Sequence, residues 1–287
     1  MNQKSIRYFF LLGSFAIALG SNAQVNGKLL LSKGQKFQID NSVKSVTSMD
    51  MMGQSMEMTA DAVLMNVLEV KTKNESSYLI AATLKKMKTT ANMMGQEMNF
   101  DSDKKEDLES PTGKAMGSQI NVTKEIELSN EAKVLNSNKA TGTKEESNPM
   151  MDMMKNIGGA NKDESNGATE AFQLLPIGKK IGDKWDDSTN ADGIKTFRTY
   201  TIKEINGTET TVTLTGTQNT NKVVEQQGME VTVNMDSKLS GQAIVDTSTG
   251  IVKEKTLTVE GTGSAEMMGQ AIPMTSKIIT TTTVKTL

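Results

Sequence analysis

The sequence contains no cysteine and no histidine among its 287 residues. Without these side chains there can be no Cys-His or Ser-His-Asp nucleophile and no zinc site of the usual imidazole or thiolate kind. A disulfide and a lipidated N-terminal cysteine are excluded as well. We therefore predict no catalytic residue and no cofactor, and we expect a protein that is not an enzyme.

Aromatic residues are scarce too, at 4% of the chain, with a single Trp and three Tyr. Methionine is abundant instead, with 21 copies, and its flexible side chain fills irregular apolar space that aromatic rings usually occupy. The formal net charge of only −2 argues against nucleic acid as a partner, because binding to phosphates calls for a basic patch.

A hydrolase without histidine or cysteine would have to rely on a Ser-Lys pair or on paired carboxylates. The acidic candidates are Asp101 with Asp103, Asp152, Asp163 with Glu164, and Asp183 with Asp186 and Asp187. A glycosidase needs two carboxyl groups across a sugar-binding cleft, and such clefts usually carry the aromatic platforms that are rare here. We interpret these acidic residues as solvated surface charge.

The first 23 residues have the pattern of an export signal. Lys4 and Arg7 give a positive start, and an apolar core follows that ends at Leu19. Small residues then predict cleavage between Ala23 and Gln24. No later stretch approaches the ~20 apolar residues that span a bilayer, so we expect no transmembrane segment after signal removal. The predicted location is the periplasm or the cell exterior; an uncleaved N-terminal anchor is the alternative.

A four-residue motif occurs three times, as Met51-Met52-Gly53-Gln54, Met93-Met94-Gly95-Gln96 and Met267-Met268-Gly269-Gln270. Each copy lies between runs that alternate apolar and polar residues, which predicts the tip of a β-hairpin with Gly-Gln as the two-residue loop.

That loop sets a register in which Met51 faces Met56 and Met49 faces Met58. Because side chains alternate along a strand, we expect all four methionines to share one face of the sheet. Val63, Met65 and Val67 also alternate, along the next part of the same predicted strand.

The whole pattern predicts an all-β fold of long antiparallel strands in a meander, curled into an open barrel or a strongly bent sheet. We divide the chain into a signal helix at 1–23, an N-terminal β half at 24–137, a flexible linker at 138–168 and a C-terminal β half at 169–287. Asn, Ser, Gly, Lys and Glu dominate the linker, which we expect to be disordered. Trp185 is expected to anchor the start of the C-terminal half.

Methionines also gather inside the linker, where Met150, Met151, Met153 and Met154 follow Pro149. Thioethers can hold Cu(I), so these four residues are weak candidates for a copper site. The alternative is a loose apolar plug.

Several of these features together resemble the uncharacterised secreted β-rich proteins common in Bacteroidetes, a domain family of unknown function. They are the exported N-terminus, the Met-Gly-Gln hairpin, Phe100-Asp101-Ser102, Leu175-Pro176 before Gly182-Asp183-Lys184-Trp185, and the late turn Gly241…Asp246…Thr249-Gly250. The resemblance implies an all-β fold and an envelope or exterior location, and it implies no catalytic residue.

The leading hypothesis is a non-enzymatic envelope protein that binds a lipophilic small molecule in a β concavity, with the segment 150–154 as a lid. The alternative is a structural or interaction module of the cell surface, with an envelope protein as its partner. Cu(I) binding by methionine clusters is the third.

Overall fold

The computed structural model describes residues 27–51, 53–93, 95–137, 167–226, 229–267 and 269–287. Residues 1–23 of the predicted signal and residues 138–166 of the predicted linker lie outside this part of the chain. The last linker residue, Ala168, lies inside it and is fully buried.

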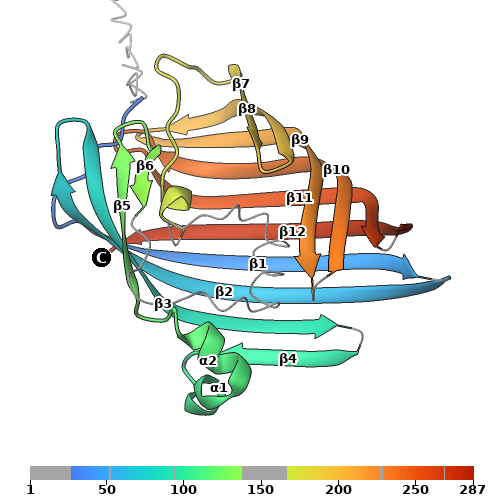
Figure 1. Ribbon diagram of the computed structural model, residues 1–287. Helices are drawn as coiled ribbons and strands as arrows, with labels where there is room; N and C mark the ends of the chain where they lie inside the picture. The colour runs from blue at the N-terminus through green and yellow to red at the C-terminus, as the bar shows by residue number, and fades with distance from the viewer. Residues whose placement is uncertain (1–26, 52, 94, 138–166, 227–228, 268) are drawn as a thin grey trace, which may run out of the picture.

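The described residues form one antiparallel sheet of 12 strands with three short helical segments (Figure 1). The strands are β1 (Lys36–Met51), β2 (Gln54–Lys73), β3 (Ser77–Met93), β4 (Gln96–Asp101), β5 (Thr123–Ser129), β6 (Val134–Ser137), β7 (Lys184–Ala191), β8 (Ile194–Asn206), β9 (Glu209–Gln226), β10 (Met229–Asp246), β11 (Ile251–Met267) and β12 (Gln270–Thr286). The helical segments are α1 (Lys105–Glu109), α2 (Pro111–Gly117) and the 3-10 turn η1 (Ala168–Ala171).

The first and last strands pair with each other in the middle of the sheet. The order across the sheet is β6-β5-β3-β2-β1-β12-β11-β10-β9-β8-β7, and β4 pairs with the second half of β3. Within the described chain, the edge strands β6 and β7 do not pair, so the sheet is not closed. The predicted all-β meander is confirmed, in the form of a strongly bent open sheet.

We define the inner face as the face that carries Phe37 and Ile39 of β1. Register places Phe37 beside Leu68 of β2, and Ile39 beside Val284 of β12. Residues 29–31 and the η1 segment pack on this face (Figure 1). Since the sheet curls around η1, the inner face is the concave one.

One hydrophobic cluster closes the end of the concavity where the chain enters β1. Leu29 and Leu31 are 1% exposed there, and Leu175 contributes from the segment after η1. Phe172 meets Phe37 edge to face, with 6.1 Å between the ring centroids, a favoured aromatic geometry.

A second cluster lies under the two short helices. Met116 of α2 is fully buried and packs with Met87 of β3 and Phe100 of β4. Ser110 caps α2, since its hydroxyl accepts a hydrogen bond from the Gly113 amide at 2.8 Å. Thus the charged stretch after β4 covers one margin of the inner face.

Glycines on the inner face allow the sheet to bend. A β-carbon on Gly216 would lie 2.2 Å from the carbonyl oxygen of Phe197, and one on Gly263 would lie 2.0 Å from that of Asn234. Strands approach so closely only where glycine stands. Figure 1 shows that β9 and β10, the strands of Gly216 and Asn234, bend sharply along their length.

The three Met-Met-Gly-Gln motifs form hairpin tips, but the predicted register is wrong by two residues. Met51 pairs with Gln54, and Met49 pairs with Met56 instead of Met58. Gly53 is the second loop residue rather than the first, with φ of 79°, and glycine supplies positive φ there at no steric cost. The other two tips show the same shift.

Candidate functional site

A row of methionines crosses the inner face near the hairpin tips, at one level of the sheet. Met49 of β1 pairs with Met56 of β2 on one side and with Met274 of β12 on the other. Met274 pairs with Gly263 of β11, which pairs with Met235 of β10. We call Met56, Met49, Met274 and Met235 the methionine row. All four are half-buried.

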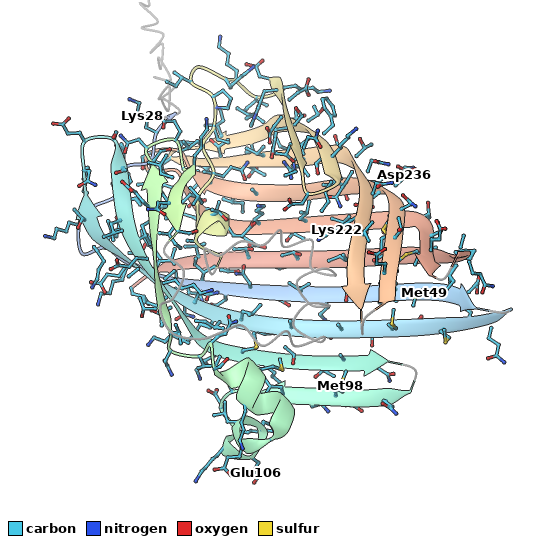
Figure 2. All side chains as sticks on the ribbon, in the orientation of Figure 1. Lys28, Met49, Met98, Glu106, Lys222 and Asp236 are labelled. Atoms are coloured by element: carbon cyan, nitrogen blue, oxygen red, sulfur yellow. The ribbon has the colours of Figure 1, made fainter. Side chains whose placement is uncertain are left out.

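Figure 2 places Met49 at the far end of β1, away from the cluster that closes the concavity. A shift of two residues keeps each side chain on its face. The prediction that Met49, Met56 and Met58 share a face is therefore correct, although the partners differ. Met235 and Met274 were not expected in the same row, because they join it through pairings between the two ends of the chain.

Small and apolar residues fill the inner face between the methionine row and the closed end. Ser45, Ala60 and Ala62 lie on β1 and β2, and Ile278 of β12 pairs with both Ser45 and Val259 of β11. Such residues leave a surface of small and apolar side chains in which hydroxyl groups also stand, and those of Thr47 and Ser276 hydrogen-bond each other at 3.2 Å. The arrangement suits contact with an apolar molecule.

Polar groups on the inner face form pairs with one another close to the closed end. Thr282 donates a hydrogen bond to Asn41 at 2.7 Å, and Lys255 of β11 makes an ion pair with Glu170 of η1 at 2.7 Å. The ion pair ties η1 to the sheet, whereas the hydrogen bond joins β12 to β1. A partly exposed ion pair contributes ~0–1 kcal/mol, so this one positions η1 more than it stabilises it.

An aromatic pair lies on the inner face at the β7 edge. Trp185 stacks on Tyr200 with 5.2 Å between ring centroids and 12° between planes. Burial raises the pKa of the Tyr200 phenol, while the nearby Arg198 guanidinium opposes this rise. The stack joins β7 to β8, which agrees with an anchoring role for Trp185.

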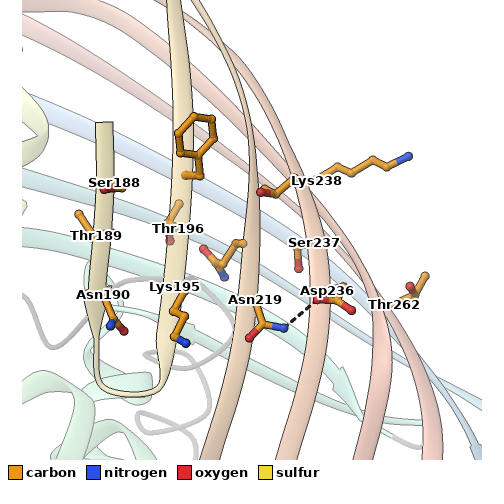
Figure 3. A pocket seen from close by; sticks show the side chains of 13 residues that line it. Ser188, Thr189, Asn190, Lys195, Thr196, Asn219, Asp236, Ser237, Lys238 and Thr262 are labelled. Atoms are coloured by element: carbon orange, nitrogen blue, oxygen red, sulfur yellow. Dashed lines mark hydrogen bonds between the residues drawn. The ribbon is translucent and has the colours of Figure 1, made fainter. Parts of the chain in front are cut away.

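The outer face carries a polar hollow of about 790 Å³ over β7 to β11 (Figure 3). Asn219 of β9 donates a hydrogen bond to Asp236 of β10 at 2.8 Å, as the dashed line in Figure 3 shows. Lys195 and Lys238 also line the hollow, and Phe197 is 48% exposed there. The hollow offers hydrogen bonds to a polar partner. Among the described residues that line it, Asp236 is the only carboxylate, so two carboxyl groups do not face each other across it.

Three of the acidic candidates lie in ion pairs where the structure shows them. Asp101 and Asp103 make surface ion pairs with Lys88 and Lys86, and Asp187 pairs with Arg198 at 3.2 Å. Over the described ranges, no three Asp or Glu side chains come together as a metal site would require.

The copper candidates Met150, Met151, Met153 and Met154 lie outside the described residues, as do Asp152, Asp163 and Glu164. The cleavage residues Ala23 and Gln24 also lie outside them. Among the helices that the structure describes, none is long and apolar enough to cross a membrane.

The fold is similar to part of lipovitellin, in a structure that concerns lipid–protein interactions in that protein. The TM-score is 0.54 at 8% sequence identity, and the match covers 89% of this chain but 25% of that chain. This chain thus spans about a quarter of the lipovitellin chain. Identity this low shows a shared fold alone.

An outer membrane channel from Pseudomonas putida F1 matches with a TM-score of 0.26 at 8% identity, over 90% of this chain and 98% of that chain. A score that low carries no argument. No curated protein matches the sequence.

A family model matches much of the meander, from the start of β3 to the beginning of β11. The matched residues are 75–252, which is more than half of the chain. The protein therefore belongs to DUF6263, a family of unknown function.

Proposed function

We propose that this protein is a non-enzymatic binding module of the cell envelope that holds a lipophilic ligand against the inner face of its sheet. The observation that carries the proposal is the half-buried apolar surface between the closed end and the hairpin tips. Met49, Met274 and Ile278 lie on that surface. An apolar concavity in a bent, unclosed sheet is a typical ligand-binding shape.

Methionine suits such a surface because its unbranched side chain adapts to apolar ligands of different shape. Each methylene group of an acyl chain removed from water contributes about 0.8 kcal/mol. The similarity to lipovitellin supports a fold that can present such a surface, while the lipid–protein interactions themselves are those of lipovitellin.

We also propose that the protein is exported, on the basis of the signal pattern in residues 1–23. The Bacteroidetes resemblance supports the same envelope location. N-terminal sequencing of protein recovered from its host tests it, and the expected first residue is Gln24. Retention of Lys4 and Arg7 in the recovered chain would contradict cleavage.

Two neighbouring isoleucines on β12 give a matched test of ligand binding. Ile278 is an inner-face residue paired with Ser45, whereas Ile279 pairs with Lys44 on the outer face. Both are half-buried. We expect Ile278→Lys to weaken binding of a fluorescent fatty acid, because the charge enters the apolar surface, and Ile279→Lys to bind as the wild type does.

Protein purified from its own host, analysed by native mass spectrometry and solvent extraction, should carry lipid. Circular dichroism verifies that both lysine variants fold. The proposal fails if host protein is ligand-free and the wild type does not bind the probe. Equal binding by the folded Ile278→Lys variant would also overturn it.

An interaction module is the second candidate, favoured by the exposed Phe197 in the polar hollow of the outer face. Cross-linking in the host that captures one protein repeatedly, and loses it with Phe197→Ala, would support this alternative. Absence of lipid from the protein purified from its host would support the same alternative.

A further inference from the structure

The methionine row brings together side chains from both ends of the chain. Met56 and Met49 come from the first hairpin, and Met274 comes from the last strand. These three stand directly opposite one another on adjacent antiparallel strands, with no register shift along either pairing. They are therefore immediate lateral neighbours on the inner face.

Lateral neighbours of this kind have β-carbons ~4.5–5.5 Å apart. A methionine thioether stands two bonds beyond its β-carbon and turns about flexible torsions. The sulfur atoms of Met56 and Met274 can thus lean toward the sulfur of Met49, which stands between them. Three thioethers can meet above the middle strand.

Met235 extends the row from the other side because two glycines leave room for it. Its sulfur lies 2.6 Å from the place that a β-carbon on Gly261 would take, and its Cα lies 2.7 Å from the equivalent place at Gly263. The Met235 side chain therefore lies over Gly261 of β11, whose partner on β12 is Ser276, one inner-face position from Met274. It is available as a fourth thioether.

The inner-face positions on either side of the row are uncharged. Thr47 and Ser276 lie on the side of the closed end, and Ile272 and Ala265 lie on the side of the tips. Hard divalent ions such as Mg²⁺ and Ca²⁺ bind through oxygen ligands that usually include carboxylates, and no carboxylate stands among these flanking positions of the described strands. Soft thioethers select Cu(I) instead.

We propose that the methionine row is a binding site for a soft monovalent cation, Cu(I) or its analogue Ag(I), with Met49, Met56 and Met274 as ligands. Met235 serves as an additional ligand. This site goes beyond the proposed lipophilic ligand, because it depends on sulfur rather than on apolar contact.

The test measures whether the full chain that remains after signal removal takes Cu(I) from a chromogenic Cu(I) chelator. Ascorbate is present to keep the copper reduced. The row variant Met49→Leu, Met56→Leu and Met274→Leu removes the thioethers and keeps volume and apolarity, since Leu and Met exchange with little cost. The matched control is Met65→Leu with Met87→Leu, because Met65 faces outward and Met87 lies in the cluster under α2. Isothermal titration with Ag(I) repeats the comparison without a redox-active ion.

Wild type and control are expected to retain Cu(I) and Ag(I), and the row variant is expected to lose both. A third variant, with Leu at Met150, Met151, Met153 and Met154, is expected to retain them. Wild type that leaves all Cu(I) with the chelator overturns the proposal, as does a row variant that binds like the wild type. Loss confined to the third variant places the metal elsewhere and overturns it too.

Leucine also separates the two proposals. The row variant should still bind the fluorescent fatty acid, because its surface remains apolar. If the protein fails to bind the metal, the proposal of a lipophilic ligand is unaffected. If it fails to bind the fatty acid, the proposal of a cation site is unaffected.

Discussion

The Tyr78 hydroxyl of β3 donates a hydrogen bond to the carbonyl oxygen of Leu29 at 2.9 Å and accepts one from the Leu31 amide at 3.4 Å. Tyr78 is 1% exposed. One side chain thus satisfies two backbone groups of the segment that precedes β1. This segment closes the end of the concavity, and the hydroxyl helps to hold it there beside the backbone hydrogen bonds of Leu29 to Asn130 and of Leu30 to Thr249.

Replacement of Tyr78 by Phe should lower the free energy of unfolding by about 1–3 kcal/mol, because two buried backbone groups lose their partner. Urea denaturation followed by circular dichroism measures the change. Thr83→Val is the control, since Thr83 shares a hydrogen bond with Thr123 at 2.8 Å on the exposed surface. Equal midpoints for Tyr78→Phe and wild type would show that the hydroxyl contributes nothing to stability.

The strands themselves were predictable, because alternation and turn residues are local signals. Residues typical of strands from Ile194 to Ile205 and from Thr210 to Thr217 flank the turn residues Asn206-Gly207, and β8 and β9 form a hairpin there. The faces were less predictable where both sides of a strand are apolar. Val63 is 50% exposed and Met65 shares its outward face, while Leu68 of the same strand is fully buried inside.

The methionine row was not predictable, because it depends on two facts that no short stretch contains. One is the turn, where glycine takes the second loop position and moves Met56 opposite Met49. The other is the pairing of β1 with β12, which brings in Met274 from the other end of the sequence. The pairing of β1 with β12 brings together residues far apart in the sequence. Its entropic cost is offset by the whole sheet, and local strand propensity does not predict it.

Substitution of Gly263 by Ala should destabilise the protein by about 1–3 kcal/mol, the usual cost of overpacking. The new β-carbon would lie 2.0 Å from the Asn234 carbonyl oxygen, so β10 and β11 must separate. Thermal unfolding measures the effect, and Gly27→Ala is the control. At Gly27 the added carbon meets only Ile177 at 3.3 Å, an exposed side chain that can move. A Gly263→Ala variant as stable as the control would contradict the close approach of the strands.

Substitution of a glycine at a hairpin tip should destabilise the protein through backbone strain rather than through steric crowding. Gly269 has φ of 77° and no atom within 4 Å of an added β-carbon. Gly269→Ala should therefore cost about 1–2 kcal/mol, whereas Gly269→Asn should cost less, because Asn tolerates the left-handed region. Chemical denaturation of the two variants compares them. Equal losses for Ala and Asn would point to a contact instead of backbone strain.

The Tyr200 phenol makes stability depend on pH in the alkaline range. Burial raises the pKa of Tyr200 above the ordinary value of 10.0, in spite of the opposing charge of Arg198. The unfolded chain therefore releases this proton at lower pH than the folded chain does, and the folded state holds more protons in between. By linkage, the stabilising contribution of the neutral phenol is fully present below pH 10.0 and is lost as the pH rises from there through the folded-state pKa.

Tyr200→Phe should remove that dependence, because Phe still stacks on Trp185 but carries no proton. We expect the free energy of unfolding of the wild type to fall more steeply above pH 10.0 than that of the variant, while the two curves run parallel near neutral pH. Urea denaturation at a series of pH values gives both curves, and phenolate absorbance follows the titration directly. Parallel curves throughout the alkaline range would show that Tyr200 titrates alike in the folded and unfolded chains, and that its face of the β7–β8 pair is open to water.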